Sequence, residues 1–216
     1  MKDKSFILRN LVLSCLKNTN FDPKKTGCQN RTKVSAIIKK GMDINMAEII
    51  KTYKQAVPAM RFVGKKYGDE DRVNGMFGAK WCEWFAEENK WMDVIAQNVN
   101  EDLSGQYEEI NDGMALMGHE NGVFKYWIGR LTPANTPVPE GFGHVDFPAG
   151  SLGACLVYGK EPDVYCREPE CCDRMIADGY KMAKNLDFNC FERYASSRFL
   201  PDKTGNVTLD ICFYVE

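Results

Sequence analysis

Two segments of this chain repeat one pattern, and this duplication constrains the fold more than any other feature of the sequence. The first segment begins at Val57 and reads VPAMRFVGKKYG, and the second begins at Phe147 and reads FPAGSLGACLVYGK. Both start with Pro-Ala, at Pro58 and Pro148, and both reach Tyr-Gly near their ends. Side chains in each segment alternate in the manner of a β-strand. We therefore predict one strand in each half of the chain.

A helix is predicted after each of these strands. In residues 75–98, apolar residues recur at helical spacing, namely Trp81, Trp84, Phe85, Trp91, Met92 and Ile95. In residues 168–178, Pro169 suits the first helical turn, and Gly179 follows where helices commonly end. Each half therefore continues from its strand into a helix.

Two further strands are predicted after each helix. In the first half they cover residues 114–119 and 124–131, joined by a turn at residues 120–122. In the second half they cover residues 188–194 and 207–215. The same order of elements therefore occurs twice.

The pattern is a β-α-β-β repeat, present over about 50–131 and again over 144–216. Such a duplication predicts an α+β fold with an antiparallel sheet and pseudo-twofold symmetry. A groove is expected where the two repeats meet, and clefts of this kind are common sites for small molecules. We therefore expect a ligand cleft between the repeats.

The net charge of −2 conceals two regions of opposite sign. Residues 1–45 hold eight Lys and two Arg against three Asp, a net charge of +7, so residues 46–216 carry −9. We interpret 1–45 as a basic N-terminal extension, poorly ordered or a short helix, and leave open whether it belongs to the native protein. Residues 46–216 form the predicted domain. Because its acidity repels phosphate, we expect no direct binding of nucleic acid.

The apolar and cysteine residues argue for a protein of the cytoplasm. No stretch approaches the roughly 18 uninterrupted apolar residues of a membrane-spanning helix, so no membrane contact is expected. The nine cysteines form neither a disulfide framework nor close pairs with zinc-ligand spacing. We therefore expect buried free thiols, no metal and no cofactor.

A carboxylate in an apolar strand is the first candidate for chemistry. In residues 188–194, alternation places Phe188, Cys190, Glu192 and Tyr194 on one face. A buried carboxylate needs a partner, a raised pKa or a cationic ligand. The alternatives are a salt bridge to a nearby Lys or Arg, or an edge position that faces water.

Aromatic side chains are the second candidate. The strand that begins at Phe124 carries three rings in four positions, with Phe124 and Tyr126 on one side and Trp127 on the other. Each ring alone is explained by core packing. As a set, the rings could line a flat pocket whose faces attract cations.

Several segments together resemble the GyrI-like small-molecule-binding family. They are VPAMRFVGKKYG, KWCEWF, FKYWIGRLTP, VPEGFGHVDFPAGSLGACLVYGKEP, FERY and LDICFYV, and they span about residues 50–215. The resemblance implies two β-α-β-β repeats around a cleft. Relatives include effector-binding domains of AraC- and MerR-type regulators, stand-alone multidrug-binding proteins, a gyrase inhibitor and hydrolases of cyclopropane-containing genotoxins.

The resemblance also implies which residues form the site. The glutamate of the FE-x-Y motif lies in the pocket of the family and maps to Glu192. Corresponding strands suggest the rings of Tyr126, Trp127, Tyr158, Trp81 and Tyr194 as ligand contacts. Residues 1–45 show no helix-turn-helix pattern, so DNA-binding regulation by this chain alone is not expected.

The expected function is that of a stand-alone GyrI-like protein. It would bind amphipathic, often cationic, aromatic small molecules in the cleft between the repeats, next to Glu192. One alternative is a hydrolase that opens cyclopropane-containing genotoxins with Glu192 as general base. A second alternative is a protein-interaction role, such as gyrase inhibition or transcription regulation through a partner.

Overall fold

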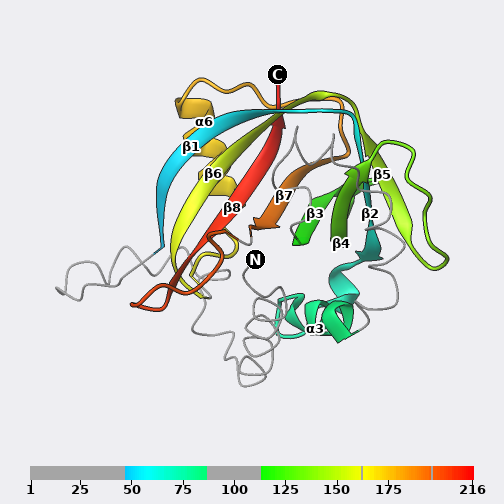
Figure 1. The fold of residues 1–216 in the computed structure, drawn as a ribbon, viewed down its shortest axis with the longest axis horizontal. Coiled ribbons are helices and arrows are strands. Elements are labelled where there is room, and N and C mark those ends of the chain that lie inside the picture. Colours follow the sequence, from blue (N-terminus) through cyan, green and yellow to red (C-terminus); the bar gives the residue numbers. More distant parts are fainter. Residues whose placement is uncertain (1–46, 87–112, 162, 196) are drawn as a thin grey trace.

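The structure is a computed structural model that describes residues 47–86, 113–161, 163–195 and 197–216. Within these residues the chain forms one antiparallel sheet and two α-helices (Figure 1). The strands are β1 (Glu48–Val57), β2 (Met60–Tyr67), β3 (Gly113–Glu120), β4 (Val123–Pro133), β5 (Gly143–Phe147), β6 (Gly150–Lys160), β7 (Phe188–Tyr194) and β8 (Asn206–Val215). The helices are α3 (Gly78–Ala86) and α6 (Glu168–Ala177), with a short 3-10 helix, η4, at Asp69–Asp71. The α+β class with an antiparallel sheet is confirmed.

The sheet has the strand order β1-β6-β8-β7-β3-β4-β2-β5. All strand pairs are antiparallel, and Figure 1 shows the sheet strongly curved. β1 and β2 follow each other in the chain, yet β1 pairs with β6, and β5 pairs with β2. Each half of the chain therefore contributes one edge strand to the sheet of the other half.

The two edge strands are the elements that sequence patterns missed. β1 has no clean apolar alternation, because much of it is exposed and carries lysines such as Lys51 and Lys54. β5 is five residues long, with His144 and Asp146 among them. Short or charged edges are common because they discourage pairing with other chains. The predicted extension at 1–45 and the part of the first predicted helix beyond Ala86 lie outside the described residues.

Local turn chemistry explains two of the boundaries. Asn121 and Gly122 have φ angles of 52° and 77° between β3 and β4, as a two-residue hairpin turn requires. Gly179 has a φ of 91° after α6, and its N–H donates to the carbonyl of Ile176. The N–H of Tyr180 donates to the carbonyl of Met175, which completes a Schellman motif.

The sheet separates two packing environments. On the face that carries α3 and α6, here called the helix face, Trp81 and Trp84 of α3 pack with Ala115, Tyr126 and Ile128. α6 packs there through Cys171 and Met175. On the opposite face, apolar residues from both halves form a second core that includes Phe62, Met114, Leu116, Trp127, Leu131, Phe147, Phe191 and Tyr214. Consecutive residues of the central strands therefore enter different cores.

A bulge in β7 changes one predicted side-chain direction. Met117 pairs with Cys190, but the next residue, Gly118, pairs with Phe188, which leaves Asn189 as an extra residue. A Cβ at Gly118 would lie 2.0 Å from the carbonyl oxygen of Asp187, so the close approach requires glycine. Phe188 consequently packs on the opposite face against Trp127, and the prediction that it shares a face with Cys190 was wrong.

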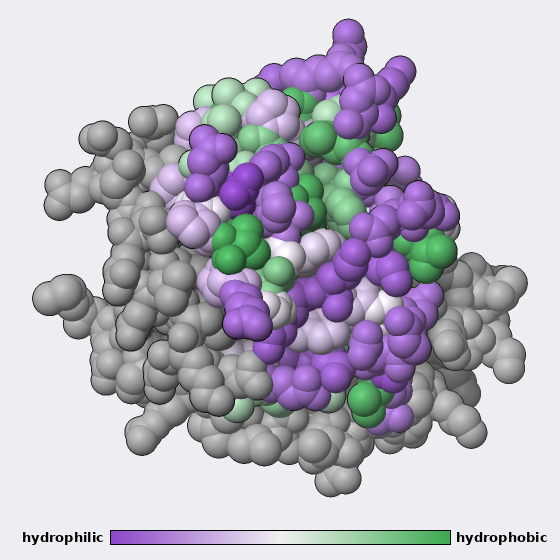
Figure 2. All heavy atoms as spheres, turned by 90° about the vertical axis from the view of Figure 1, so that its right-hand side faces the viewer, coloured by the Kyte–Doolittle hydropathy of each residue, from purple (hydrophilic) through white to green (hydrophobic). Residues whose placement is uncertain are grey.

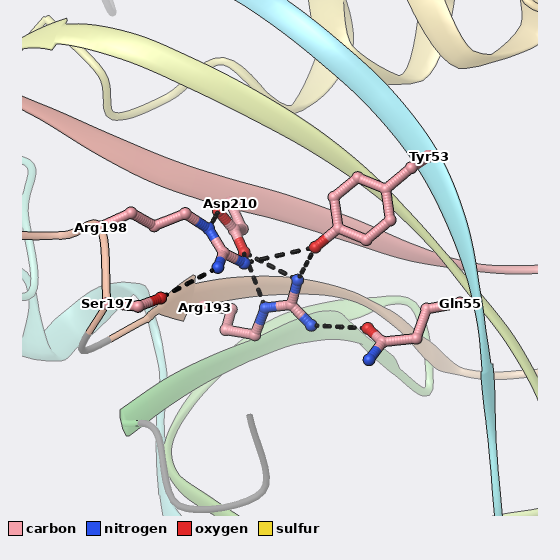
Figure 3. Close-up of polar contacts among 6 residues, drawn as sticks. All are labelled: Tyr53, Gln55, Arg193, Ser197, Arg198 and Asp210. Carbon is pink, nitrogen blue, oxygen red and sulfur yellow. Dashed lines mark hydrogen bonds and ion pairs between the residues drawn. The ribbon is translucent and has the colours of Figure 1, made fainter. Parts of the chain in front are cut away.

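A buried charged cluster lies on the opposite face (Figure 3). Arg193 of β7 and Asp210 of β8 are both 0% exposed, and their side chains lie 2.7 Å apart. Arg198, after β7, also pairs with Asp210. Arg193 donates to the hydroxyl of Tyr53 at 2.6 Å and to Gln55 at 3.2 Å, both on β1. The cluster therefore links the edge strand β1 to the centre of the sheet.

Hydrophilic residues cover most of the described surface on the side of β2 and β5, with hydrophobic residues in small separate patches (Figure 2). None of the described helices has the length and apolar composition needed to cross a membrane. Within the described ranges, Cys155, Cys171, Cys190 and Cys212 are buried, and Cys82, Cys166 and Cys172 are partly exposed.

Candidate functional site

A cavity of about 850 Å³ lies on the helix face. Its walls come from the loop and helix at 72–82, from the ends of β3 and β4, from β7, and from the segment at 161–172 that leads into α6. Its volume is within the range of sites for drug-sized molecules. The charged and aromatic side chains that line it include Arg72, Phe77, Trp81, Phe124, Tyr126, Glu168, Glu192 and Tyr194.

Glu192 lies in the wall formed by β7. Its side chain is 6% exposed, and its Oε2 accepts hydrogen bonds from the hydroxyls of Tyr126 at 2.8 Å and Tyr194 at 3.0 Å. The indole Nε1 of Trp81 in turn donates to the hydroxyl of Tyr126 at 3.0 Å. A chain of donors from three elements thus ends on one carboxyl oxygen. Such donors compensate part of the cost of burying a carboxylate.

Glu168 is a second acid in the same cavity. It is the first residue of α6, and its side chain lines the cavity together with that of Glu192. No sequence pattern assigned it a role, because an acid in the first turn of a helix is already explained by the helix dipole. Its place in the wall of the cavity depends on how α6 packs on the sheet, which the sequence alone does not show.

The pKa values of both acids are raised. Burial is the main cause for Glu192, the charge of Glu168 adds to it, and together they raise the pKa of Glu192 to about 7 despite the two tyrosine donors. Burial likewise raises the pKa of Glu168, and the charge of Glu170 adds to the effect. Glu192 therefore gains or loses a proton close to neutral pH.

The tyrosines remain donors at neutral pH. Burial and the charge of Glu192 raise the pKa of Tyr126 and of Tyr194 well above the ordinary value of 10.0. Both hydroxyls therefore keep their protons over the range in which Glu192 titrates.

Aromatic rings form much of the cavity wall. Phe77 stacks on Tyr126 with 4.1 Å between ring centroids and 6° between planes, and Trp81 meets Tyr194 edge-on at 4.8 Å. The guanidinium of Arg72 lies 4.5 Å from the centroid of Phe77 and 5.1 Å from that of Phe124. The rings thus already hold one cation of the protein, as aromatic faces are expected to do.

Four of the six predicted site residues line this cavity: Trp81, Tyr126, Glu192 and Tyr194. Trp127 and Tyr158 do not. Trp127 faces the opposite side of the sheet, where it packs edge-on against Phe62 and lines a smaller hollow of about 460 Å³. Tyr158 donates to Asp202 at 2.6 Å. Because neighbouring residues of a strand point to opposite faces, Tyr126 and Trp127 cannot both face one cavity.

The arrangement suits recognition of a positively charged aromatic molecule. It combines ring faces, hydroxyl donors and two acids in the wall of one cavity. Among the described residues that line the cavity, Glu161, Glu168 and Glu192 are acidic and Arg72 is the permanently charged base. The balance of charge inside the cavity is therefore negative.

No protein-family model and no curated protein matches the sequence. Solved structures do match. An integron cassette protein of Vibrio cholerae shares 12% identity and a TM-score of 0.43 over 79% of this chain and 99% of its own. SAV2435 bound to tetraphenylphosphonium shares 16% identity and a TM-score of 0.49, over 77% of this chain and 94% of its own. A hydrolase from Listeria innocua shares 13% identity and a TM-score of 0.43, over 85% of this chain and 98% of its own.

All three similarities lie below a TM-score of 0.5 and below 25% identity. At these identities and TM-scores they carry neither an activity nor a ligand to this chain.

Proposed function

We propose that this chain is a GyrI-like small-molecule-binding domain that takes amphipathic, cationic aromatic compounds into the cavity on the helix face. The observation that carries the proposal is Glu192, a buried acid that is surrounded by rings at the wall of a cavity of ligand size. A cation with an aromatic body would gain both electrostatic attraction and ring contacts there.

The order of strands supports a duplicated architecture. The strand order is β1-β6-β8-β7-β3-β4-β2-β5. If each strand is replaced by its counterpart in the other half (β1 by β5, β2 by β6, β3 by β7, β4 by β8, and the reverse), the same order is obtained, read from the other edge of the sheet. Each half also places its helix between its second and third strands. We infer two β-α-β-β repeats, each preceded by an edge strand, that are related by a pseudo-twofold axis between β3 and β7. The cavity would then lie where the repeats meet.

Titration with tetraphenylphosphonium, a bulky aromatic cation of fixed charge, tests the proposal by isothermal calorimetry. We expect saturable binding to one site. A neutral probe provides the control for charge: a naphthalene that bears a tert-butyl group should bind more weakly than its trimethylammonium isostere. Absence of saturable binding, or equal affinity for the isosteres, would contradict the proposal.

Two tryptophans on opposite sides of the sheet provide a matched pair of variants. Trp81→Phe removes both a ring face and the donor to Tyr126, so we expect binding of tetraphenylphosphonium to weaken by about 3- to 30-fold. Trp127→Phe alters the other core and should leave the affinity within about twofold, because the ring does not reach the cavity. Calorimetry on both variants makes the comparison, and equal losses would argue against this cavity as the site.

Hydrolysis of a strained electrophile is the second candidate, and the pKa of Glu192 favours it. A carboxyl group that titrates near pH 7 is suited to general acid–base catalysis at neutral pH. If the chain opens a cyclopropane-containing genotoxin by adding water, Glu192→Gln should lower the rate by roughly 10²–10⁴-fold. Mass spectrometry of the ring-opened product measures this, and an unchanged rate in the variant would exclude Glu192 as the base.

A further inference from the structure

Phe77 is an aromatic ring of the cavity wall that other side chains of the protein already cover. Tyr126 stacks on it with 4.1 Å between ring centroids and 6° between planes. The guanidinium of Arg72 lies over the same ring, 4.5 Å from its centroid. Phe77 is therefore only 5% exposed, although it lines a cavity of ligand size. A ligand that is to stack on Phe77 has to move one of these two side chains.

Arg72 also contacts a second ring of the wall. Its guanidinium lies 5.1 Å from the centroid of Phe124, and the centroids of Phe77 and Phe124 are 6.5 Å apart. Cations within about 6 Å of a ring face are attracted by it. Phe77 and Phe124, here called the phenylalanine subsite, thus form a cation site that Arg72 fills. Tyr126, which stacks on Phe77, donates to Glu192 at 2.8 Å, so the subsite and this acid belong to one wall.

The hydrogen bonds of Arg72 are local. Arg72 follows η4 in the chain, and within the described residues it donates to Asp69 at 2.8 Å and to the carbonyl of Gly75 at 3.0 Å. Asp69 is 70% exposed, so water screens this ion pair. Within the described part of the fold, turning the guanidinium away from the rings therefore breaks no hydrogen bond to another strand or helix. Tyr126, by contrast, is held by its hydrogen bonds with Trp81 and Glu192.

The backbone next to Arg72 is a tight hairpin. Val73 and Met76 exchange backbone hydrogen bonds of 2.9 and 3.1 Å, and both residues line the cavity. Asn74 and Gly75 between them have φ angles of 53° and 79°, as a type I′ turn requires. The hairpin gives the rim of the cavity a defined backbone, and opening the phenylalanine subsite needs rotation of the Arg72 side chain alone.

We propose that the phenylalanine subsite binds the aromatic cation of the ligand, and that the ligand displaces Arg72 from it. This inference rests on the proposed function. Two positive charges over the same pair of rings repel each other, so Arg72 and an organic cation compete for the subsite. An incoming cation replaces one contact between a cation and a ring by another, whereas a neutral molecule only removes it. Arg72 thus acts as an internal ligand that lowers the affinity for every molecule that enters.

Variants of two residues that contact each other should have effects of opposite sign. Arg72→Gln removes the internal ligand, so calorimetry should show that tetraphenylphosphonium binds about 3- to 30-fold more tightly. Phe124→Leu removes a ring of the subsite and should weaken binding by about 2- to 10-fold. A disturbed fold would weaken binding in both variants, so a gain in affinity separates displacement from a merely structural role of Arg72. Arg72→Lys restores a tethered cation and should bring the affinity back to within about threefold of wild type.

A second cation–ring pair of the protein provides matched controls. Lys65 lies over the ring of Phe142 at 5.3 Å from its centroid, and neither residue lines the cavity. Lys65→Gln and Phe142→Leu repeat both chemical changes away from the subsite, and each should leave the affinity within about twofold.

The neutral naphthalene that bears a tert-butyl group separates displacement from charge repulsion. A neutral ring also has to displace the guanidinium, but the charge of Arg72 does not repel it. Arg72→Gln should therefore tighten binding of this probe too, by about threefold or more. A structure of the tetraphenylphosphonium complex gives a direct readout: a phenyl group should lie within about 6 Å of the centroid of Phe77, with the guanidinium of Arg72 turned toward solvent.

The outcomes are distinct. If wild type binds tetraphenylphosphonium and Arg72→Gln binds it equally or more weakly, the displacement is overturned and the proposed function stands. Tightening for the cation alone, with the neutral probe unchanged, would make Arg72 a repelling charge and would also overturn the displacement. Absence of binding to both wild type and Arg72→Gln would overturn the proposed function and this inference together.

Discussion

Glu192→Gln is expected to weaken binding of tetraphenylphosphonium by about 10- to 100-fold at pH 8, above the pKa of about 7 of the wild-type carboxyl. Glutamine keeps the shape of the side chain and can still accept from the hydroxyls of Tyr126 and Tyr194. The substitution therefore removes the charge while preserving most of the local hydrogen bonding. The loss should be much smaller for the neutral tert-butyl probe.

The same substitution should stabilise the ligand-free protein at high pH. The pKa of Glu192 is about 7 in the folded state and 4.5 in the ordinary reference state, so the folded protein binds more protons in this window. The contribution of Glu192 to the free energy of unfolding is therefore greatest below about pH 4.5, and it is lost as the pH rises through 7. Between these two pH values the free energy of unfolding should fall by about 3 kcal/mol because of this group.

Urea denaturation at pH 5 and pH 8 measures this difference. Wild-type protein should lose stability between the two values relative to Glu192→Gln, whose amide does not titrate. Glu83→Gln serves as a control, because its carboxyl is exposed on α3. A variant that binds tetraphenylphosphonium as tightly as wild type at pH 8 would contradict the role of Glu192. If the free energy of unfolding changed equally between pH 5 and pH 8 in wild type and in Glu192→Gln, the raised pKa of Glu192 would be contradicted.

Asp210→Asn is expected to destabilise the fold by about 3–5 kcal/mol, the largest effect on stability that we predict. Asp210 is the acid that both Arg193 and Arg198 contact, and Arg193 is fully buried (Figure 3). Without it, a buried guanidinium keeps its charge but loses the carboxylate that faces it. The loss would be a large part of the 5–15 kcal/mol typical of a whole domain.

A surface pair provides the matched control for this prediction. Arg61 and Asp146 form the same type of ion pair between β2 and β5, with Asp146 57% exposed. Asp146→Asn should cost no more than about 1 kcal/mol, because solvent screens exposed pairs. Urea denaturation of both variants makes the comparison. A cost for Asp210→Asn that is as small as the cost for Asp146→Asn would show that the cluster is not a major source of stability.

Local patterns were sufficient for most of the secondary structure. The strands β3, β4, β7 and β8 and the helix α6 lie within two residues of the predicted bounds, because each combines a clear periodicity with a distinct turn or cap. Asn121-Gly122 and Gly179 adopt the positive φ angles that such signals require. β1 and β5 were missed because their strand character comes from pairing with the other half of the chain, and pairing of this kind leaves no local period in the sequence.

The candidate site was only partly predictable for the same reason. Alternation along β7 and β4 placed Glu192 with Tyr194, and Tyr126 opposite Trp127, without any coordinates. Whether a set of rings meets a given carboxylate depends on which face of the sheet the helices cover. That choice brings Trp81 to Tyr126 and excludes Trp127 and Tyr158 from the cavity.

The sequence by itself determined the repeated order of elements, the acidic strand residue Glu192 and the local turns, because these depend on neighbours close in the chain. Tertiary structure alone decided the exchange of edge strands, the bulge that turns Phe188 away and the place of Glu168 in the wall of the cavity. Each of these involves residues far apart in the chain, brought together when the helices and strands pack. The cavity that both Glu168 and Glu192 line is therefore a property of the folded sheet and α6 together.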